Sequence, residues 1–163
     1  DVLSRLSTAL LTSIYQMKHT LLILISLLGS LCYAQQTDPI KSLNIFFEGF
    51  HNRDSLKIKS VLSLDAKLFR TGNSKDGIPK RQEMSMTNFI KVVSSRPETP
   101  VWKEELGVPI VSQHQNLAQI WVPFSFYLDG ELSHCGFNAL QLFWDGTTWL
   151  ITELSDTATK QCR

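Results

Sequence analysis

The sequence predicts an α+β domain in which helices come first and a run of antiparallel strands follows. Two observations indicate this class. Apolar residues recur at helical spacing over residues 38–53 and 87–95, whereas alternating apolar runs joined by Asp-Gly turns fill residues 101–155. The chain has 163 residues, 43% of them hydrophobic and 19% charged, which is the composition of one globular domain rather than of a disordered or low-complexity protein.

The first 34 residues are expected to lie outside this domain. Residues 17–34 have the order of a secretory signal peptide, because Met17 and Lys18 precede a short apolar run, and Cys32 and Ala34 fit a peptidase site before Gln35. The apolar run is shorter than the about 20 residues that span a bilayer, which argues against an anchor. Residues 1–16 are interpreted as an upstream or non-native extension. The sequence therefore predicts an exported protein, periplasmic or secreted, with one domain over residues 35–163 and no membrane contact after cleavage.

Capping residues and apolar stripes predict the helices. Asp38 can accept a hydrogen bond as N-cap, and Pro39 suits the first helical position, because the N–H that proline lacks would have no partner there. The apolar stripe that follows consists of Ile40, Leu43, Phe46, Phe47 and Phe50. Asp54 can cap a second, short helix. A short strand over residues 67–71, a polar loop over residues 72–81 and a third helix over residues 87–95 come next.

Four strands are expected over residues 101–113, 117–128, 131–144 and 149–155. Asp129-Gly130 and Asp145-Gly146 are strong hairpin signals between such runs. A two-residue turn at Asp129-Gly130 would pair Val122 with Phe137 and Ala118 with Gln141 on an apolar face that packs against the helices, together with Leu150, Thr152 and Leu154 of the last strand. The other face would then collect a mixed set of polar and aromatic side chains: Trp121, Tyr127, His134, Asn138, Trp149, Ile151, Glu153 and Ser155.

The mixed face can line a ligand site, form a dimer interface or be solvated, and patterning alone favours the solvated surface. Gln141 falls on the apolar face, where a buried amide needs a partner, so it is either a satisfied core amide or part of a pocket wall. The residues expected to bind a ligand are Trp121, Tyr127, His134, Asn138 and Gln141.

Charge and motifs exclude several functions. Lysine and arginine number 16 against 15 acidic residues, so the chain lacks the basic surface that nucleic-acid binding requires. His51, His114 and His134 have no metal-ligand spacing, and nucleotide-binding and serine-hydrolase motifs are absent from the sequence. We therefore expect no metal, no cofactor and no nucleic-acid partner.

Cys135 and Cys162 are the cysteines that follow the signal peptide, and an oxidising compartment would permit a disulfide between them. The second hairpin places Cys135 near Asp156, and the six residues up to Cys162 can span about 20 Å, so Cys162 can fold back to Cys135. The alternative is a buried Cys135 thiol and a separate thiol near the C-terminus.

Two segments resemble the nuclear transport factor 2-like, or SnoaL-like, superfamily: FFEGFHNRD (residues 46–54), and the long meander that ends in DGTTWLI (residues 145–151). This resemblance covers residues 38–157. SHCGFNALQL (residues 133–142) and Cys162 also resemble a group of small exported bacterial proteins without an assigned activity. The resemblance implies a cone-shaped fold, in which a strongly curved antiparallel sheet wraps around three N-terminal helices and leaves an apolar pocket inside.

The superfamily includes ketosteroid isomerases, which use a tyrosine and an aspartic acid as hydrogen-bond donors and another aspartate as base. By the resemblance, their tyrosine corresponds to Phe46 and their base falls at or near Arg70, so that activity is not expected. Arg70 either faces an anionic ligand or is solvated. The nearest acid–base candidates are His134, Glu153 and Asp156, and His134 and Asp156 are the catalytic candidates.

The sequence thus leads to three hypotheses. The first is an exported homodimer that binds a small apolar or amphipathic molecule in the cone. The alternatives are an isomerase, cyclase or hydrolase-type enzyme with a pocket acid or base, and a protein-binding module.

Overall fold

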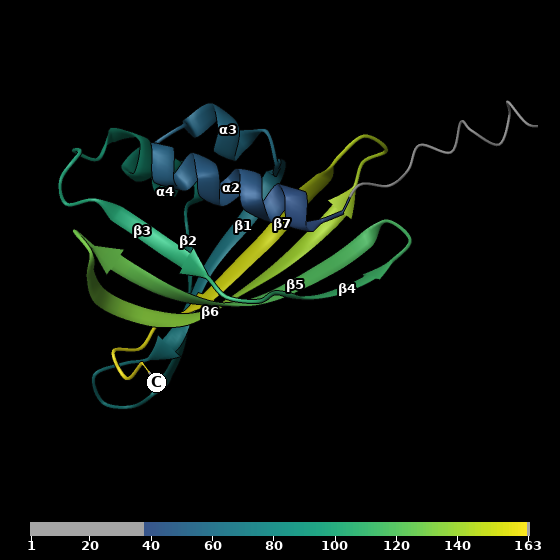
Figure 1. Cartoon of the computed structure of the whole chain (residues 1–163). Helices are drawn as coiled ribbons and strands as arrows, with labels where there is room; N and C mark the ends of the chain where they lie inside the picture. The colour runs from purple at the N-terminus through teal and green to yellow at the C-terminus, as the bar shows by residue number, and fades with distance from the viewer. Residues whose placement is uncertain (1–37, 163) are drawn as a thin grey trace, which may run out of the picture. The chain divides into compact units, whose positions relative to one another are not determined.

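Three helices pack against one face of a curved sheet in residues 38–162, which are the residues that the computed structural model describes (Figure 1). The helices are α2 (Ile40–Asn52), α3 (Ser55–Lys59) and α4 (Met86–Ser95). The strands are β1 (Leu62–Asn73), β2 (Pro79–Met84), β3 (Trp102–Leu106), β4 (Ile110–His114), β5 (Leu117–Leu128), β6 (Glu131–Trp144) and β7 (Trp149–Thr157). The α+β class is confirmed. The predicted N-terminal extension and signal peptide lie outside the described residues.

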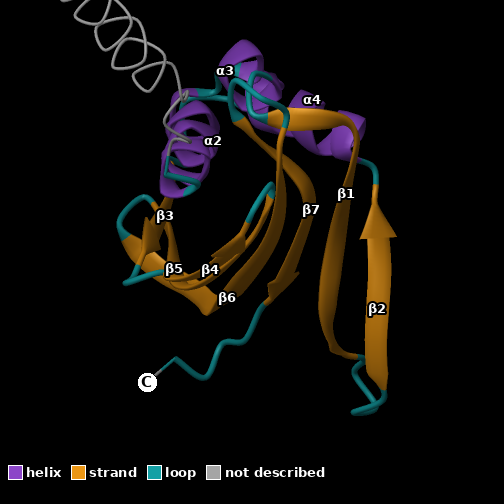
Figure 2. Ribbon diagram, turned by 90° about the vertical axis from the view of Figure 1, so that its right-hand side faces the viewer, coloured by secondary structure: helices purple, strands orange, loops and turns teal. Residues whose placement is uncertain are grey.

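The sheet is curved and mixed rather than wholly antiparallel (Figure 2). Its order is β2-β1-β7-β6-β5-β3, and β4 also pairs with β5. Every neighbouring pair is antiparallel except β1 and β7, which run parallel. These two strands are joined through most of the domain, and a connection of that length permits the parallel direction that a tight hairpin forbids. No helix in residues 38–162 is long and apolar enough to cross a membrane.

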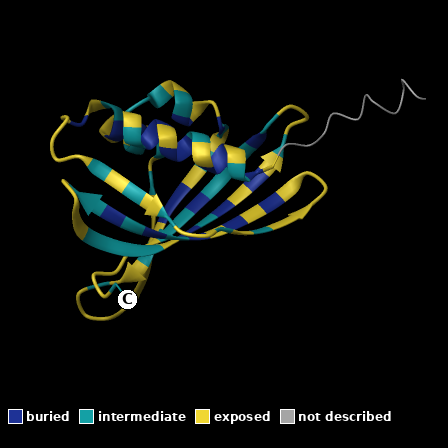
Figure 3. Cartoon of the chain, in the orientation of Figure 1, coloured by how far each residue is buried: buried dark blue, intermediate teal, exposed yellow. Residues whose placement is uncertain are grey.

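The helix ends follow the predicted capping chemistry. Asp38 Oδ1 accepts the N–H of Ile40 at 2.9 Å, and Asp54 Oδ1 accepts the N–H groups of Leu56 and Lys57 at the start of α3. The predicted stripe on α2 faces the sheet, with Leu43, Phe46, Phe47 and Phe50 buried. Figure 3 shows the same pattern, since buried positions lie on the sheet side of α2 and alternate along the central strands.

Three strand predictions differ from the structure. The strand expected over residues 67–71 is β1, which runs from Leu62 to Asn73. The segment expected to be one strand over residues 101–113 forms β3 and β4, with a break where Gly107 packs against Pro123. The polar segment predicted as a loop over residues 72–81 contains the first three residues of β2, which pairs with β1. β2 is an edge strand with no fully buried residue, so its sequence lacks the apolar alternation that predicts a strand.

Arg96 joins α2, α4 and β3. Its guanidinium donates hydrogen bonds to the carbonyl oxygens of Phe50 at 2.7 Å and His51 at 3.1 Å, which are groups at the C-terminal end of α2. It also donates to the Val93 carbonyl of α4 and lies 5.0 Å from the ring centroid of Trp102 on β3. At the other end of α2, buried Ser42 donates to the carbonyl of Trp149 at 2.6 Å.

The β5–β6 hairpin starts as predicted and then shifts by one residue. Leu128 lies opposite Glu131, and Tyr127 opposite Leu132, but the next pair is Phe126 with His134. Ser133 is therefore the extra residue of a β-bulge. Because successive side chains point to opposite faces, one extra residue exchanges the two faces of β6 beyond it.

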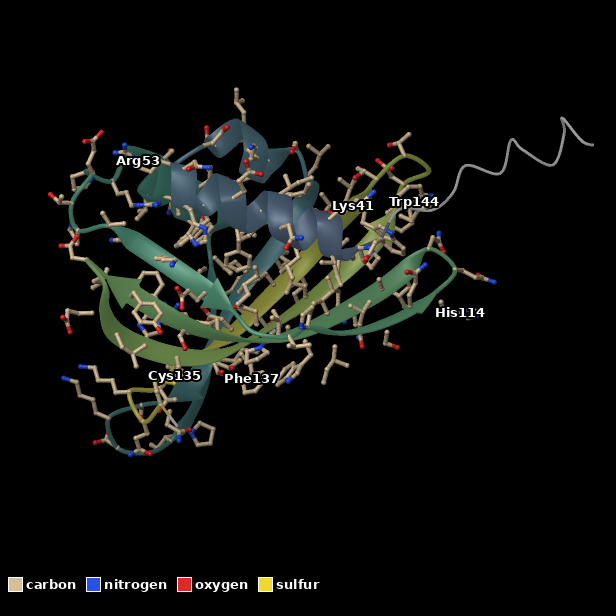
Figure 4. All side chains as sticks on the ribbon, viewed as in Figure 1. Lys41, Arg53, His114, Cys135, Phe137 and Trp144 are labelled. Carbon is tan, nitrogen blue, oxygen red and sulfur yellow. A yellow bond between two sulfur atoms is a disulfide. The ribbon has the colours of Figure 1, made fainter. Side chains whose placement is uncertain are left out.

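The predicted pairs of Val122 with Phe137 and Ala118 with Gln141 are consequently wrong. Asn138 and Leu142 stand in those places, facing the helices, and both are buried. Cys135, Phe137 and Gln141 face the convex side of the sheet, so Gln141 is neither a core amide nor part of the wall against the helices. Figure 4 shows Cys135 and Phe137 on the side away from the helices.

A second register shift moves the face of β7. Gln141 pairs with Glu153, whereas the next residue along β6, Leu142, pairs with Ile151, so Thr152 is the extra residue. Trp149 and Ile151, predicted on the mixed face, are 0% exposed in the core instead. Beyond the shift, Leu154 is buried on the same side.

Cys135 and Cys162 form a disulfide, with their Cα atoms 5.7 Å apart. The backbone N–H and carbonyl of Cys135 also exchange hydrogen bonds with Thr159, so the chain after β7 runs back along β6. Gly136 allows this close approach, because a Cβ there would lie 2.0 Å from the Thr157 carbonyl oxygen.

The variant Cys162→Ser is expected to have a lower melting temperature than wild type under non-reducing conditions and the same melting temperature in the presence of reductant. The disulfide links residues 27 positions apart, and in the chain-entropy account such a crosslink contributes on the order of 3 kcal/mol by restricting the unfolded chain. Thermal unfolding of wild type and variant, with and without reductant, checks this. An equal loss of melting temperature in both conditions would contradict a stabilising disulfide.

Candidate functional site

A cavity of about 640 Å³ lies between the helices and the concave face of the sheet. Its volume falls within the range of about 300–1,000 Å³ that is usual for small-molecule sites. Helices α2 and α4 and strands β3 and β5 supply a largely aromatic wall, made of Phe46, Phe47, Phe50, Phe89, Trp102, Phe124 and Phe126.

A row of polar side chains crosses the sheet side of this cavity. The strand register places Arg70 of β1 beside Asp156 of β7, and Asp156 beside Asn138 of β6. Arg70 holds both carboxylate oxygens of Asp156, with Nε 2.9 Å from Oδ1 and Nη2 2.6 Å from Oδ2. Glu104 enters from β3, and its Oε1 accepts a hydrogen bond from Asn138 Nδ2 at 2.7 Å. Four strands thus converge on one polar cluster.

Glu104 is the most perturbed carboxyl group of the cavity. Burial raises its pKa to about 7, the Asn138 hydrogen bond opposes this rise, the Asp156 carboxylate adds to it and Arg70 opposes it. The backbone N–H of Glu104 donates to Nε2 of His51 at 3.0 Å, which fixes β3 against the end of α2. Among residues 38–162, Glu104 forms no ion pair within 4.0 Å.

His134 presents a neutral imidazole to the cavity. Its ring stacks on Phe126, with 4.8 Å between centroids, and meets Phe124 edge-on at 5.9 Å. Burial, followed by the charge of Arg70, lowers its pKa, and Asp156 only partly offsets this. Nδ1 lies 3.2 Å from the Ser133 hydroxyl oxygen. The ring can therefore accept or donate one hydrogen bond without carrying charge at neutral pH.

Of the six ligand-binding and catalytic candidates from the sequence, the structure brings three together in the cavity: His134, Asn138 and Asp156. The other three lie elsewhere. Trp121 and Gln141 border a smaller hollow of about 280 Å³ on the convex face, together with Glu153. Tyr127 pairs with Lys103 of β3. The bulge at Ser133 explains this separation, because it carries His134 and Asn138 to the face opposite Trp121.

Sequence reasoning missed Glu104. A signal was present, since Trp102, Glu104 and Leu106 alternate along one strand and a carboxyl between two large apolar residues on one face indicates burial. Arg70 is half exposed, with 51% of its side chain accessible to solvent, and its charge is paired with Asp156, so it is not a free partner for an anion. Among the described residues, His, Cys, Asp and Glu form no group of three or more that could hold a metal ion.

No protein-family model and no curated protein matches this sequence. Solved structures do match its fold. An NTF2-like protein with a cystatin-like fold from Novosphingobium aromaticivorans has a TM-score of 0.60 and 10% identity, covering 85% of this chain and 92% of its own.

Two further structures agree. An NTF2-like protein from Cytophaga hutchinsonii has a TM-score of 0.58 and 13% identity over 74% of this chain and 94% of its own. An NTF2-like protein of unknown function from Shewanella baltica has a TM-score of 0.57 and 14% identity over 75% of this chain and 91% of its own. At these identities the likeness is one of fold, and the NTF2-like fold implied by the sequence resemblance is confirmed.

The variant Glu104→Gln is expected to stabilise the protein at pH 8 and to have little effect at pH 4.5. Folding raises the pKa of Glu104 from 4.5 to about 7. Protonation of Glu104 therefore stabilises the folded state fully below the unfolded pKa, and this stabilisation is lost as the pH rises through the folded pKa. The free energy of unfolding of the variant, minus that of wild type, should therefore increase by on the order of 3 kcal/mol from pH 4.5 to pH 8.

Urea denaturation of wild type and variant at both pH values measures this gain. The matched control is Glu105→Gln, on the exposed side of the same strand. A difference between wild type and Glu104→Gln that does not change with pH would contradict the burial of this carboxyl group.

Proposed function

We propose, from the NTF2-like fold and the cavity inside it, that this protein is an exported homodimer that binds a small amphipathic molecule. One observation carries the proposal: a cavity of about 640 Å³ has an aromatic wall on one side and a polar cluster on the other. An apolar body would pack against rings such as Phe50 and Phe126, while a polar group would meet Glu104, Asn138 and His134. Pockets of this composition bind ligands through apolar contact and orient them through a few polar groups.

Export is supported by two independent features. Residues 17–34 have the sequence pattern of a signal peptide, and the domain carries a disulfide between Cys135 and Cys162. Disulfides persist in oxidising compartments such as the periplasm or the extracellular space and are rare in the cytosol. The protein would accordingly bind the proposed ligand outside the cytoplasm.

A second candidate function is catalysis by proton transfer on the bound molecule. Glu104 favours it, because a carboxyl group with a pKa of about 7 can both accept and donate a proton near neutral pH. His134 lies in the same cavity and could act with it. Asp156, expected as a base from the sequence, is engaged by Arg70 through both oxygens. A bell-shaped pH dependence of turnover, abolished in Glu104→Gln, would favour this candidate.

Native mass spectrometry of the protein expressed in and purified from its own host tests ligand binding. We expect an added small-molecule mass that is lost on denaturation. The variant Leu128→Trp should lose this mass, since Leu128 is a partly buried residue that lines the cavity, and a larger ring there would reduce the space for a ligand. The control Leu64→Trp, at an exposed residue outside the cavity, should retain it.

Binding of the neutral dye Nile red, followed by fluorescence titration, serves as the second measurement. A wild-type protein that carries no added mass and does not bind the dye saturably would overturn the proposal. Equal retention of ligand by both tryptophan variants would place binding outside the cavity.

The dimer proposal rests on apolar side chains exposed on the convex face, defined here as the convex patch: Ile110 (68% exposed), Trp121 (46%), Phe137 (40%) and Phe143 (45%). Trp121 and Phe137 stack with 5.0 Å between ring centroids. An exposed apolar patch of this kind is typical of an interaction surface.

We expect Trp121→Glu to convert the dimer into a monomer, because the interface would bury an unpaired charge. Light scattering after size-exclusion chromatography measures the mass. Leu64→Glu, which adds the same charge at an exposed residue outside the convex patch, is the control and should remain dimeric. A monomeric wild type would refute the dimer.

A further inference from the structure

We propose that the cavity selects a ligand with a positively charged head, such as a primary ammonium group, on an apolar body. This inference rests on the proposed binding function and adds the chemical class of the ligand. It follows from the balance of charges in the polar cluster, from the surroundings of Glu104 and from the aromatic rings beside that carboxyl group.

The charges of the polar cluster do not cancel. Arg70 supplies one positive charge, and its guanidinium is paired bidentately with Asp156. His134 is neutral, and so is His51 at the end of α2, whose Nε2 accepts the Glu104 N–H. Once ionised, Glu104 therefore gives the cavity one negative charge for which the described residues provide no separate cation.

Other nearby basic groups do not supply that charge. Arg96 lies at the C-terminal end of α2, where its guanidinium donates hydrogen bonds to backbone carbonyl groups. Lys103 points to the opposite side of β3 and pairs with Glu105 at 2.6 Å. Neither residue lines the cavity.

Glu104 has capacity for a further partner. A carboxylate offers about four acceptor positions on its two oxygens, and the amide of Asn138 occupies one of them. A buried carboxylate is costly unless it is paired and hydrogen-bonded. An ammonium group carries three donors and a positive charge, so it would meet both requirements at once.

Aromatic rings flank the carboxyl group on two sides. Trp102 is two residues before Glu104 on the same face of β3, and Phe126 stands directly opposite Glu104 on β5. The rings of Trp102 and Phe126 meet edge-on, with 5.9 Å between centroids. A cation bound at Glu104 would lie beside these rings, and aromatic faces attract ammonium groups through their quadrupoles.

Anionic ligands are disfavoured by the same arrangement. A carboxylate head would approach Glu104 and Asp156, and the one cation of the cluster is already paired. A neutral alcohol could bond to Glu104 but would leave its charge uncompensated. The expected order of affinity is therefore ammonium, then alcohol, then carboxylate.

Three probes with the same eight-carbon chain test this order: octylammonium, 1-octanol and octanoate, each competing with Nile red at pH 8. For wild type we expect octylammonium to bind about tenfold more tightly than 1-octanol. The difference in free energy between a charge-assisted and a neutral hydrogen bond corresponds to about this factor in the dissociation constant. Octanoate should bind most weakly. Glu104→Gln should remove the preference for octylammonium, whereas Glu105→Gln should keep it.

The outcomes separate this inference from the proposed function. Equal affinity for the three probes, abolished in Leu128→Trp, would overturn the charge selection and leave ligand binding intact. A preference for octylammonium that survives in Glu104→Gln would also overturn it. Failure of Nile red and all three probes to bind would reject the binding function itself. Circular dichroism melting curves establish that each variant is folded.

Discussion

The bulge at Ser133 determines which side chains of β6 enter the cavity. Without the extra residue, the alternation of the strand would turn Cys135, Phe137 and Gln141 toward the helices and His134 and Asn138 away from them. The shift places Asn138 where it can hold Glu104, and it places Cys135 outside, where the chain after β7 reaches it. The polar cluster and the disulfide thus depend on the same backbone irregularity.

A second set of contacts holds the carboxyl-bearing strand in place. The guanidinium of Arg96 binds the last carbonyl groups of α2 and lies against Trp102, while the imidazole of His51 accepts the N–H of Glu104. The helix end and the strand are therefore positioned by the same few side chains. Folding disfavours the ionised form of Glu104, which is why its pKa rises, and proteins commonly retain such unfavourable groups where function requires them.

The sequence predicts local features of this fold well and non-local ones poorly. The apolar stripe of α2 and the Asp54 cap follow from interactions within a few residues, and the structure has both. The parallel pairing of β1 with β7 and the shifts at Ser133 and Thr152 depend on strands distant in the chain, and no local pattern marks them. The sequence analysis names the cavity residues His134 and Asn138, but it places them on the opposite face of the sheet from the one they occupy. Glu104 could have been found, because its neighbours Trp102 and Leu106 indicate a buried position.

The edge strand β2 carries features that limit strand pairing between copies of this protein. An exposed strand edge offers free backbone groups to any other strand, and charged side chains and proline are the usual protection. β2 begins with Pro79, and both Lys80 and Arg81 are exposed. Arg81 lies over the ring of Phe69, 3.4 Å from its centroid, and pairs with Glu153. Pro79, the two exposed cations and these contacts of Arg81 protect this edge against pairing with a strand of another copy.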